Sequence, residues 1–179
     1  MSSKIDAILH SARQARNEHR LQDAKCALLD GMEACRQTGQ KAELALVLKA
    51  LGRIERDMGN PEIALPLYEE AVTIYRDRDQ PLALAHTIRH VADMQQDLGR
   101  AELAEGNYRE ALAIYRDHPE TSPLDLANAI RGLAILASDT AKNEEARALW
   151  QEAHDLYAAV NVEPGVKESS RRLAVLASR

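Results

Sequence analysis

The chain of 179 residues has no phenylalanine, one tryptophan and two cysteines, and only eight glycines and six prolines. Few helix breakers and few aromatic residues favour helices over a β-sandwich or barrel. No stretch approaches the roughly 18 apolar residues that a membrane-spanning helix needs. The N-terminal segment lacks the apolar core of a signal peptide. We therefore expect an all-α protein of the cytoplasm.

Other absences exclude classes of chemistry. The net charge is −5, which argues against broad nucleic-acid binding because that requires a basic surface. Cys26 and Cys35 point to opposite sides of one expected helix, so they form neither a disulfide nor a shared metal site. His86, His90 and Asp93 share a helix face, but no glutamate stands beside a histidine to act as a base, and the signal for zinc is weak. Nucleophile, phosphate-loop and dinucleotide motifs are missing, and we predict no enzyme activity and no cofactor.

The chain repeats itself with a period of 40 to 42 residues. Residues 44–75, 84–115 and 126–157 align with one another, a degenerate copy precedes them, and half a copy follows. Small residues recur at three sites in each copy, and large residues fill two others. The small residues are Ala12, Gly52, Ala92, Ala134 and Ala174, then Ala24, Ala64, Ala104 and Ala146, then Gly31, Ala71, Ala111 and Ala153. The large sites hold all six aromatic residues of the chain, Tyr68, Tyr75, Tyr108, Tyr115, Trp150 and Tyr157, so we expect a buried role for each.

This alternation of small and large residues resembles the tetratricopeptide repeat (TPR) family, in a long-helix variant. The resemblance implies a right-handed α-solenoid of antiparallel helix pairs, with four repeats and a terminal helix in one domain over residues 1–179. The repeats cover about 4–40, 41–80, 81–122 and 123–162, and the terminal helix covers 163–179. First helices are expected over 3–18, 41–58, 81–98, 123–140 and 163–178, and second helices over 21–38, 61–79, 101–117 and 143–160. The two additional residues of the longer spacing are expected in the connection 118–122.

In this family the first helices line the concave groove, and here they are more basic than the rest of the chain. One groove-facing position holds Lys49, Arg89, Arg131 and Arg171 in four consecutive units. The candidate peptide-binding residues are Lys49, Arg53, Arg89, His90, Asn128, Arg131 and Arg171, with Arg13, Arg56, His86 and Arg172 beside them. A competing interpretation is that these cations only pair with Asp57, Asp93, Asp97 and Asp139. Gly132, Ile135 and Val175 suggest room for an apolar side chain at the C-terminal end.

The resemblance implies a non-catalytic scaffold that binds a protein or peptide segment in its groove, and the basic groove residues lead us to expect an acidic segment. Lys49 matches one residue of the carboxylate clamp found in some family members, but Arg53 and His90 stand where the clamp has asparagines, so that specific mode is unsupported. Two alternatives are a homo-oligomeric structural module, such as a homodimer, and a ligand-sensing regulatory domain of a larger system. The repeat pattern does not identify the partner.

Overall fold

The computed structural model describes residues 2–178, and this part of the chain forms nine α-helices and no strand. Every predicted helix is present, and each end agrees with the prediction to within two residues. No helix in the described part is long and apolar enough to cross a membrane. The helices are α1 (Ser2–Asn17), α2 (Leu21–Thr38), α3 (Lys41–Asp57), α4 (Pro61–Asp77), α5 (Pro81–Asp97), α6 (Ala101–Asp117), α7 (Pro123–Asp139), α8 (Asn143–Ala159) and α9 (Glu163–Ala177).

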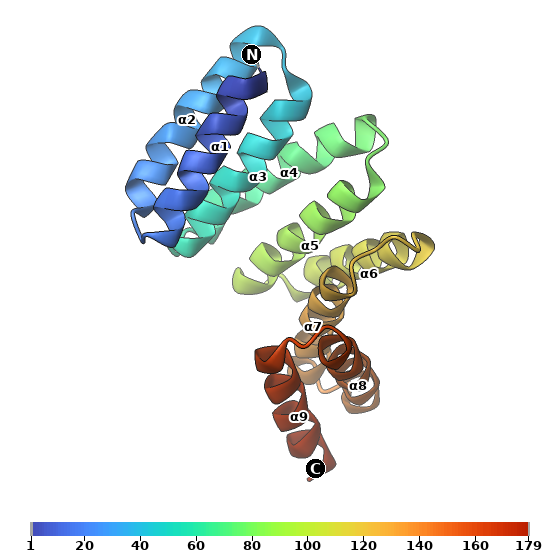
Figure 1. Cartoon of the computed structure of the whole chain (residues 1–179). Coiled ribbons are helices and arrows are strands. Elements are labelled where there is room, and N and C mark those ends of the chain that lie inside the picture. Colours follow the sequence, from blue (N-terminus) through green and yellow to red (C-terminus); the bar gives the residue numbers. More distant parts are fainter. Residues whose placement is uncertain (1, 179) are drawn as a thin grey trace.

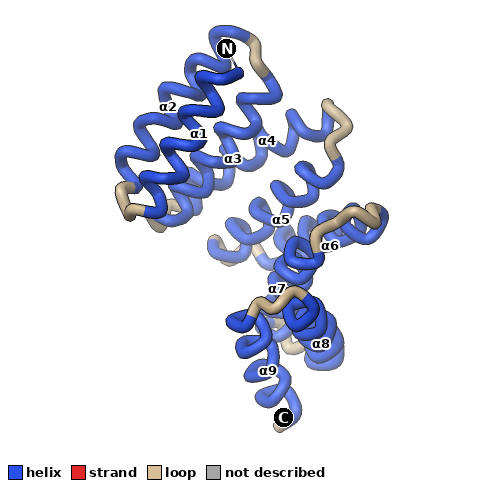
Figure 2. Tube along the Cα trace, viewed as in Figure 1, coloured by secondary structure: helices blue, strands red, loops and turns tan. Residues whose placement is uncertain are grey.

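The helix pairs follow one another along an elongated, twisting array (Figure 1), and short loops join the helices (Figure 2). The N-terminal pairs α1/α2 and α3/α4 lie at one end, α5/α6 lie in the middle, and α7 to α9 form the other end. Sequential helices pack against each other throughout, and among the first helices α1 also contacts α3 and α5 contacts α7. The N and C termini therefore lie at opposite ends of the array.

The connections follow the repeat as closely as the helices do. All but one of the inter-helix connections contain a residue with positive φ, which ends the preceding helix. Equivalent positions of the four turns within pairs hold His19, Gly59, Gly99 and Ala141. The exception is the connection 118–122, which is longer than the others, as predicted. There the Thr121 hydroxyl donates to the Tyr115 carbonyl at 2.8 Å and closes the end of α6.

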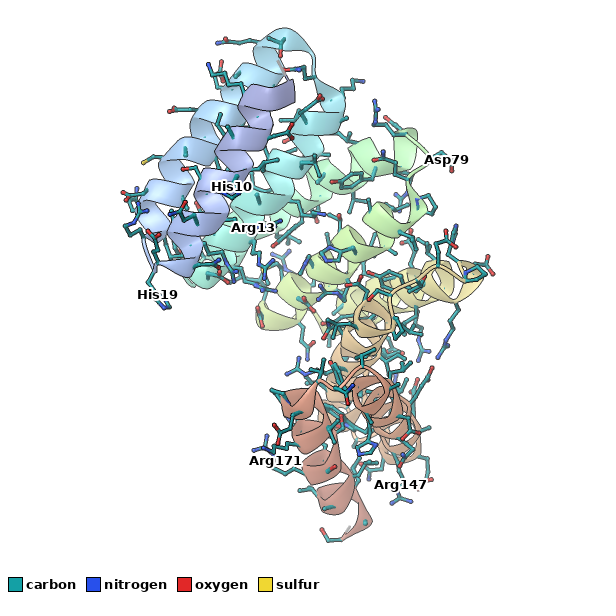
Figure 3. All side chains as sticks on the ribbon, in the orientation of Figure 1. His10, Arg13, His19, Asp79, Arg147 and Arg171 are labelled. Atoms are coloured by element: carbon teal, nitrogen blue, oxygen red, sulfur yellow. The ribbon has the colours of Figure 1, made fainter. Side chains whose placement is uncertain are left out.

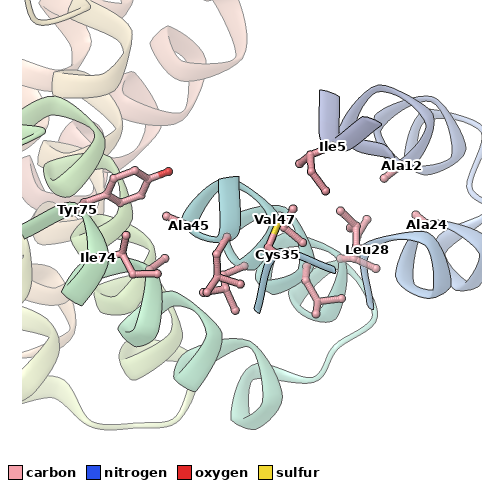
Figure 4. Packing of buried hydrophobic residues seen from close by; sticks show 14 of the residues in the cluster. Ile5, Ala12, Ala24, Leu28, Cys35, Ala45, Val47, Ile74 and Tyr75 are labelled. Atoms are coloured by element: carbon pink, nitrogen blue, oxygen red, sulfur yellow. The ribbon is translucent and has the colours of Figure 1, made fainter. Parts of the chain in front are cut away.

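The core is formed by the small and large repeat positions. Ala64, Ala71, Ala104 and Ala111 are fully buried at helix crossings, as predicted, and each aromatic side chain is at most 2% exposed. Figure 4 shows how such residues interlock in the N-terminal cluster. Ala174 is the exception among the small sites because it is exposed. No second helix follows α9 in the described chain to cover that site.

Ion pairs join consecutive second helices at equivalent positions. Three arginines, each in the last turn of its helix, reach a glutamate of the next second helix. The pairs are Arg36–Glu70, Arg76–Glu110 and Arg116–Glu152, at 2.7, 2.6 and 2.9 Å. Arg109 also pairs with Glu145. Glu70 and Glu145 therefore each have a cation of the preceding second helix within ion-pair distance.

Candidate functional site

Two pockets lie along the first helices. The N-terminal pocket is lined mainly by α1, α3 and α5, and the C-terminal pocket by α3, α5 and α7. Figure 3 shows the side chains of the whole chain on the ribbon, with Arg13 of the N-terminal pocket labelled on α1. Side chains of α4 and α6 reach the pockets from beneath, through Tyr68 and Tyr108.

The N-terminal pocket combines an apolar floor with cationic walls and includes no aspartate or glutamate. Its volume is about 220 Å³. The apolar part consists of Leu9, Ala12, Leu28, Leu46, Ala50 and Ile54. The polar part consists of Arg13, Arg16, Lys49, Arg53, Tyr68, His86 and His90.

The cations of the N-terminal pocket are poorly compensated. Arg16 pairs with Asp57, but no carboxylate among residues 2–178 pairs with Arg13, Lys49 or Arg53. Burial lowers the pKa of Lys49, whose ammonium lies 5.7 Å from the centre of the Tyr75 ring. Burial and nearby positive charges, those of Arg16 and Arg56, lower the pKa of Arg53.

Three rings form the side of this pocket that lies over α4 and α5. His90 stacks on Tyr68 with ring centres 5.1 Å apart and meets His86 edge-on at 4.8 Å. Burial lowers the pKa of His90 to about 4 and that of His86 further, so both imidazoles are neutral near pH 7. Burial raises the pKa of Tyr68 to about 12. The Tyr68 hydroxyl has no hydrogen-bond partner within the described chain.

The C-terminal pocket is organised around Asp93. Its carboxylate accepts hydrogen bonds from Arg89 at 2.9 Å, from Tyr108 at 2.8 Å and from His90 Nδ1 at 3.2 Å. Arg56 of α3 lies 3.6 Å from the same carboxylate. Burial opposes ionisation of Asp93, but the hydrogen bond from His90 and the charge of Arg89 lower its pKa to about 2. These contacts hold the groove together at the junction of the second and third repeats.

Further along the groove, the predicted site residues also have partners within the chain. Arg131 forms a two-pronged ion pair with Glu168 of α9 at 2.6 and 3.0 Å. Asn128 accepts a hydrogen bond from the Tyr157 hydroxyl at 2.9 Å. Arg171 is exposed on α9 and lines neither pocket (Figure 3). Thus Lys49, Arg53 and His90 lie together in the N-terminal pocket, whereas Arg89, Asn128 and Arg131 lie in the other.

The C-terminal end offers no apolar hole at Gly132. A Cβ atom added there would lie 2.4 Å from the Tyr108 ring, because that ring already occupies the space above the glycine. Ile135 does line the pocket. The sequence could not show this, since the room at Gly132 depends on the rotamer of a tyrosine from the neighbouring helix.

The competing expectation of internal pairing holds for some cations. Asp57 and Asp93 have cationic partners, as that expectation required. Asp97 and Asp139 have none among the described residues, and Arg131 uses Glu168 instead. The sequence interpretation missed Glu168. Its position in the copy that follows Arg131 could have indicated that the two side chains form an ion pair.

Comparison with known proteins agrees with this architecture. A family model described as tetratricopeptide repeat matches residues 44–77, which cover most of α3 and all of α4. The other helix pairs repeat the same small and large sites at the same spacing. Residues 44–77 thus match a tetratricopeptide repeat, and the other helix pairs share the architecture of that repeat. TPR domains are generally non-catalytic and mediate protein–protein interactions, and this general function is the one that the fold supports.

Solved structures show the same fold at low sequence identity. BtubC (BKLC) from P. vanneervenii is 18% identical, with a TM-score of 0.79 over 88% of this chain, and this chain spans 64% of that protein's length. A kinesin light chain-type protein from Podosopora anserina with nearly identical TPR-like repeats is 17% identical, with a TM-score of 0.62. That match covers 99% of this chain and 97% of the other. Comparison with curated protein sequences gave no significant match.

Proposed function

We propose that this TPR domain is a non-catalytic interaction scaffold that binds an acidic peptide or protein segment in its concave groove. The observation that carries the proposal is the N-terminal pocket, where Arg13, Lys49 and Arg53 surround an apolar floor and form no ion pair with a carboxylate of the described residues. A solenoid groove is open along its length, so an extended segment can lie across several helices. An acidic residue of that segment would supply the missing negative charge.

The seven candidate residues then divide into two roles. Lys49 and Arg53 contact the acidic segment directly, and exposed Arg171 offers a further contact beyond the two pockets. Arg89 and His90 hold the groove in shape through Asp93, and Asn128 and Arg131 do so through their bonds to Tyr157 and Glu168. The binding partner is a protein segment, no cofactor is required, and we expect the interaction to take place in the cytoplasm.

The test is binding of fluorescent degenerate peptides with and without fixed glutamates, measured by polarisation. The wild-type domain should prefer the glutamate set, and the affinity should fall as salt rises because exposed charge pairs are screened. The double variant Lys49→Glu/Arg53→Glu should lose at least about tenfold in affinity, which is about 1.4 kcal/mol. Lys41→Glu is the control because it reverses one positive charge on α3 outside both pockets, as each half of the double variant does within the N-terminal pocket.

Circular-dichroism melts of all variants establish that they fold alike. Equal binding of the glutamate and neutral sets by the wild-type domain, or unchanged binding by the double variant, would overturn the proposal. The acidic segment would then bind elsewhere or not at all.

A further inference from the structure

The repeat itself shows what is missing in the N-terminal pocket. Tyr68 and Tyr108 occupy equivalent sites, one repeat apart. The Tyr108 hydroxyl donates its hydrogen to Asp93 at 2.8 Å, and the side-chain amide of Gln96 lies 3.0 Å from the same oxygen. One repeat earlier, the residues equivalent to Asp93 and Gln96 are Arg53 and Arg56.

This exchange explains why the Tyr68 hydroxyl has no partner among the described residues. The tyrosine side chain is fully buried, its hydroxyl is protonated at neutral pH, and it lines the pocket. A buried hydroxyl without an acceptor is energetically unfavourable. In the third repeat the carboxylate of Asp93 contacts both Tyr108 and the neighbouring arginines. In the second repeat the equivalent position holds the cation Arg53, so Tyr68 lacks such a carboxylate. The pocket is therefore arranged for an anion that comes from outside the chain.

The amount of positive charge indicates which anion. Arg13, Lys49 and Arg53 have no carboxylate partner within residues 2–178. A single carboxylate carries one negative charge and would leave most of this charge unneutralised. A phosphate monoester carries about 1.5 to 2 negative charges at pH 7 and three strong acceptor oxygens. The pocket offers hydrogen-bond donors that suit a phosphate: the guanidinium groups of Arg13 and Arg53, the ammonium group of Lys49 and the phenol of Tyr68.

We infer that the N-terminal pocket recognises a phosphorylated serine or threonine within the bound segment. This inference rests on the proposed peptide-binding function and names the group that the segment carries. A nucleotide fits less well, because each aromatic side chain of the chain is at most 2% exposed and offers no face for a base. The apolar floor formed by Leu9, Leu46 and Ala50 receives the residues beside the phosphorylated one.

The test compares three degenerate peptide sets that differ only at one central residue, which is phosphoserine, glutamate or serine. Phosphoserine should bind at least about tenfold more tightly than glutamate, because it supplies more charge and more acceptors. The preference should weaken below about pH 6, where the phosphate takes up a proton. Arg13→Gln and Arg53→Gln should each remove most of the preference, and Lys41→Gln should retain it.

Tyr68→Phe tests the neutral donor separately. It removes a hydroxyl that has no partner in the described chain, so the domain should fold normally and should lose part of the preference for phosphoserine over glutamate. An unchanged preference in Tyr68→Phe would overturn the assigned role of this hydroxyl.

The remaining outcomes separate the inference from the proposed function. Equal affinity for phosphoserine and glutamate, with both above serine, would overturn the inference and leave acidic-segment binding intact. Weak and equal binding of all three sets would overturn both. Inorganic phosphate that competes as well as the phosphopeptide, mole for mole, would show a site for a free anion and would overturn recognition of a segment.

Discussion

The two halves of the groove are built from the same helix repeat, but their basic side chains differ in whether they form ion pairs. In the N-terminal pocket, Arg13, Lys49 and Arg53 have no acidic partner within the described chain. In the C-terminal pocket, Arg89 pairs with Asp93 and Arg131 pairs with Glu168. The repeat position therefore determines where a basic side chain lies in the groove. The residue opposite determines whether that side chain forms an internal ion pair or is available to bind a partner.

Two repeat positions account for the difference. The position that holds Arg13 and Arg53 in the first two repeats holds Asp93 in the third and Ile135 in the fourth. The second position holds His86, Asn128 and Glu168 in the third, fourth and terminal copies, and its last member pairs with Arg131 of the preceding repeat. This position thus holds a neutral ring toward one end of the groove and a carboxylate at the other.

The largest expected effect comes from removing the centre of the paired half. Asp93→Ala leaves Arg89 without its ion pair and leaves His90 and Tyr108 without their shared acceptor. Removing one partner from a buried charge network is strongly destabilising, so we expect the free energy of unfolding to fall by about 3 kcal/mol. Urea melts measure it.

Asp97→Ala is the matched control for this variant. Asp97 lines the same pocket and has no ion-pair partner among the described residues, and burial raises the pKa of its carboxyl group. Its removal should therefore leave stability unchanged or slightly higher. Equal losses in the two variants would mean that Asp93 does not organise the pocket.

The sequence predicts the helices, their pairing and the basic groove because these depend on residues within one repeat. Ala104 and Tyr108, for example, are fixed in the core by spacing alone. The partners of Arg131 and Tyr108 are not predicted in this way, because they depend on how one helix is rotated against the next. Glu55 makes the same point, since this buried carboxylate is 1% exposed and pairs with Lys25 of the preceding helix at 2.7 Å. Periodicity indicates which face is buried, and it does not identify the atoms that meet there.

A smaller effect separates the two tyrosines beneath the pockets. Gly132→Ala places a Cβ atom 2.4 Å from the Tyr108 ring, which is held in place by the hydrogen bond from its hydroxyl to Asp93. Overpacking costs about 1–3 kcal/mol, and the higher helix propensity of alanine offsets about 1 kcal/mol of it. We expect a net loss of up to about 2 kcal/mol.

Gly52→Ala is the equivalent change in the other half. The added Cβ atom would lie 3.0 Å from the Tyr68 ring, whose hydroxyl is not tied to a partner in residues 2–178. A shift of a few tenths of an ångström relieves that contact, so helix propensity should cancel the cost to within about 0.5 kcal/mol. Thermal melts of both variants give the comparison, and a larger loss at Gly52 would contradict it.

The smallest effect is the most diagnostic, because the same substitution should act with opposite sign in the two halves. Burial and the charges of Arg16 and Arg56 lower the pKa of Arg53, so the folded domain disfavours its protonated form at every pH at which arginine is charged. Arg53→Gln should therefore stabilise the domain, by about 0.5 kcal/mol or less because the side chain is exposed. The pair with Glu168 raises the pKa of Arg131, so Arg131→Gln should destabilise the domain by about 0.5–1 kcal/mol.

Added salt should shrink both effects, since it screens repulsion and attraction alike. A stabilised Arg53 variant that no longer binds acidic peptide would show that the N-terminal pocket gives up stability for recognition. Destabilisation of the domain by both substitutions would mean that Arg53 is a structural residue like Arg131.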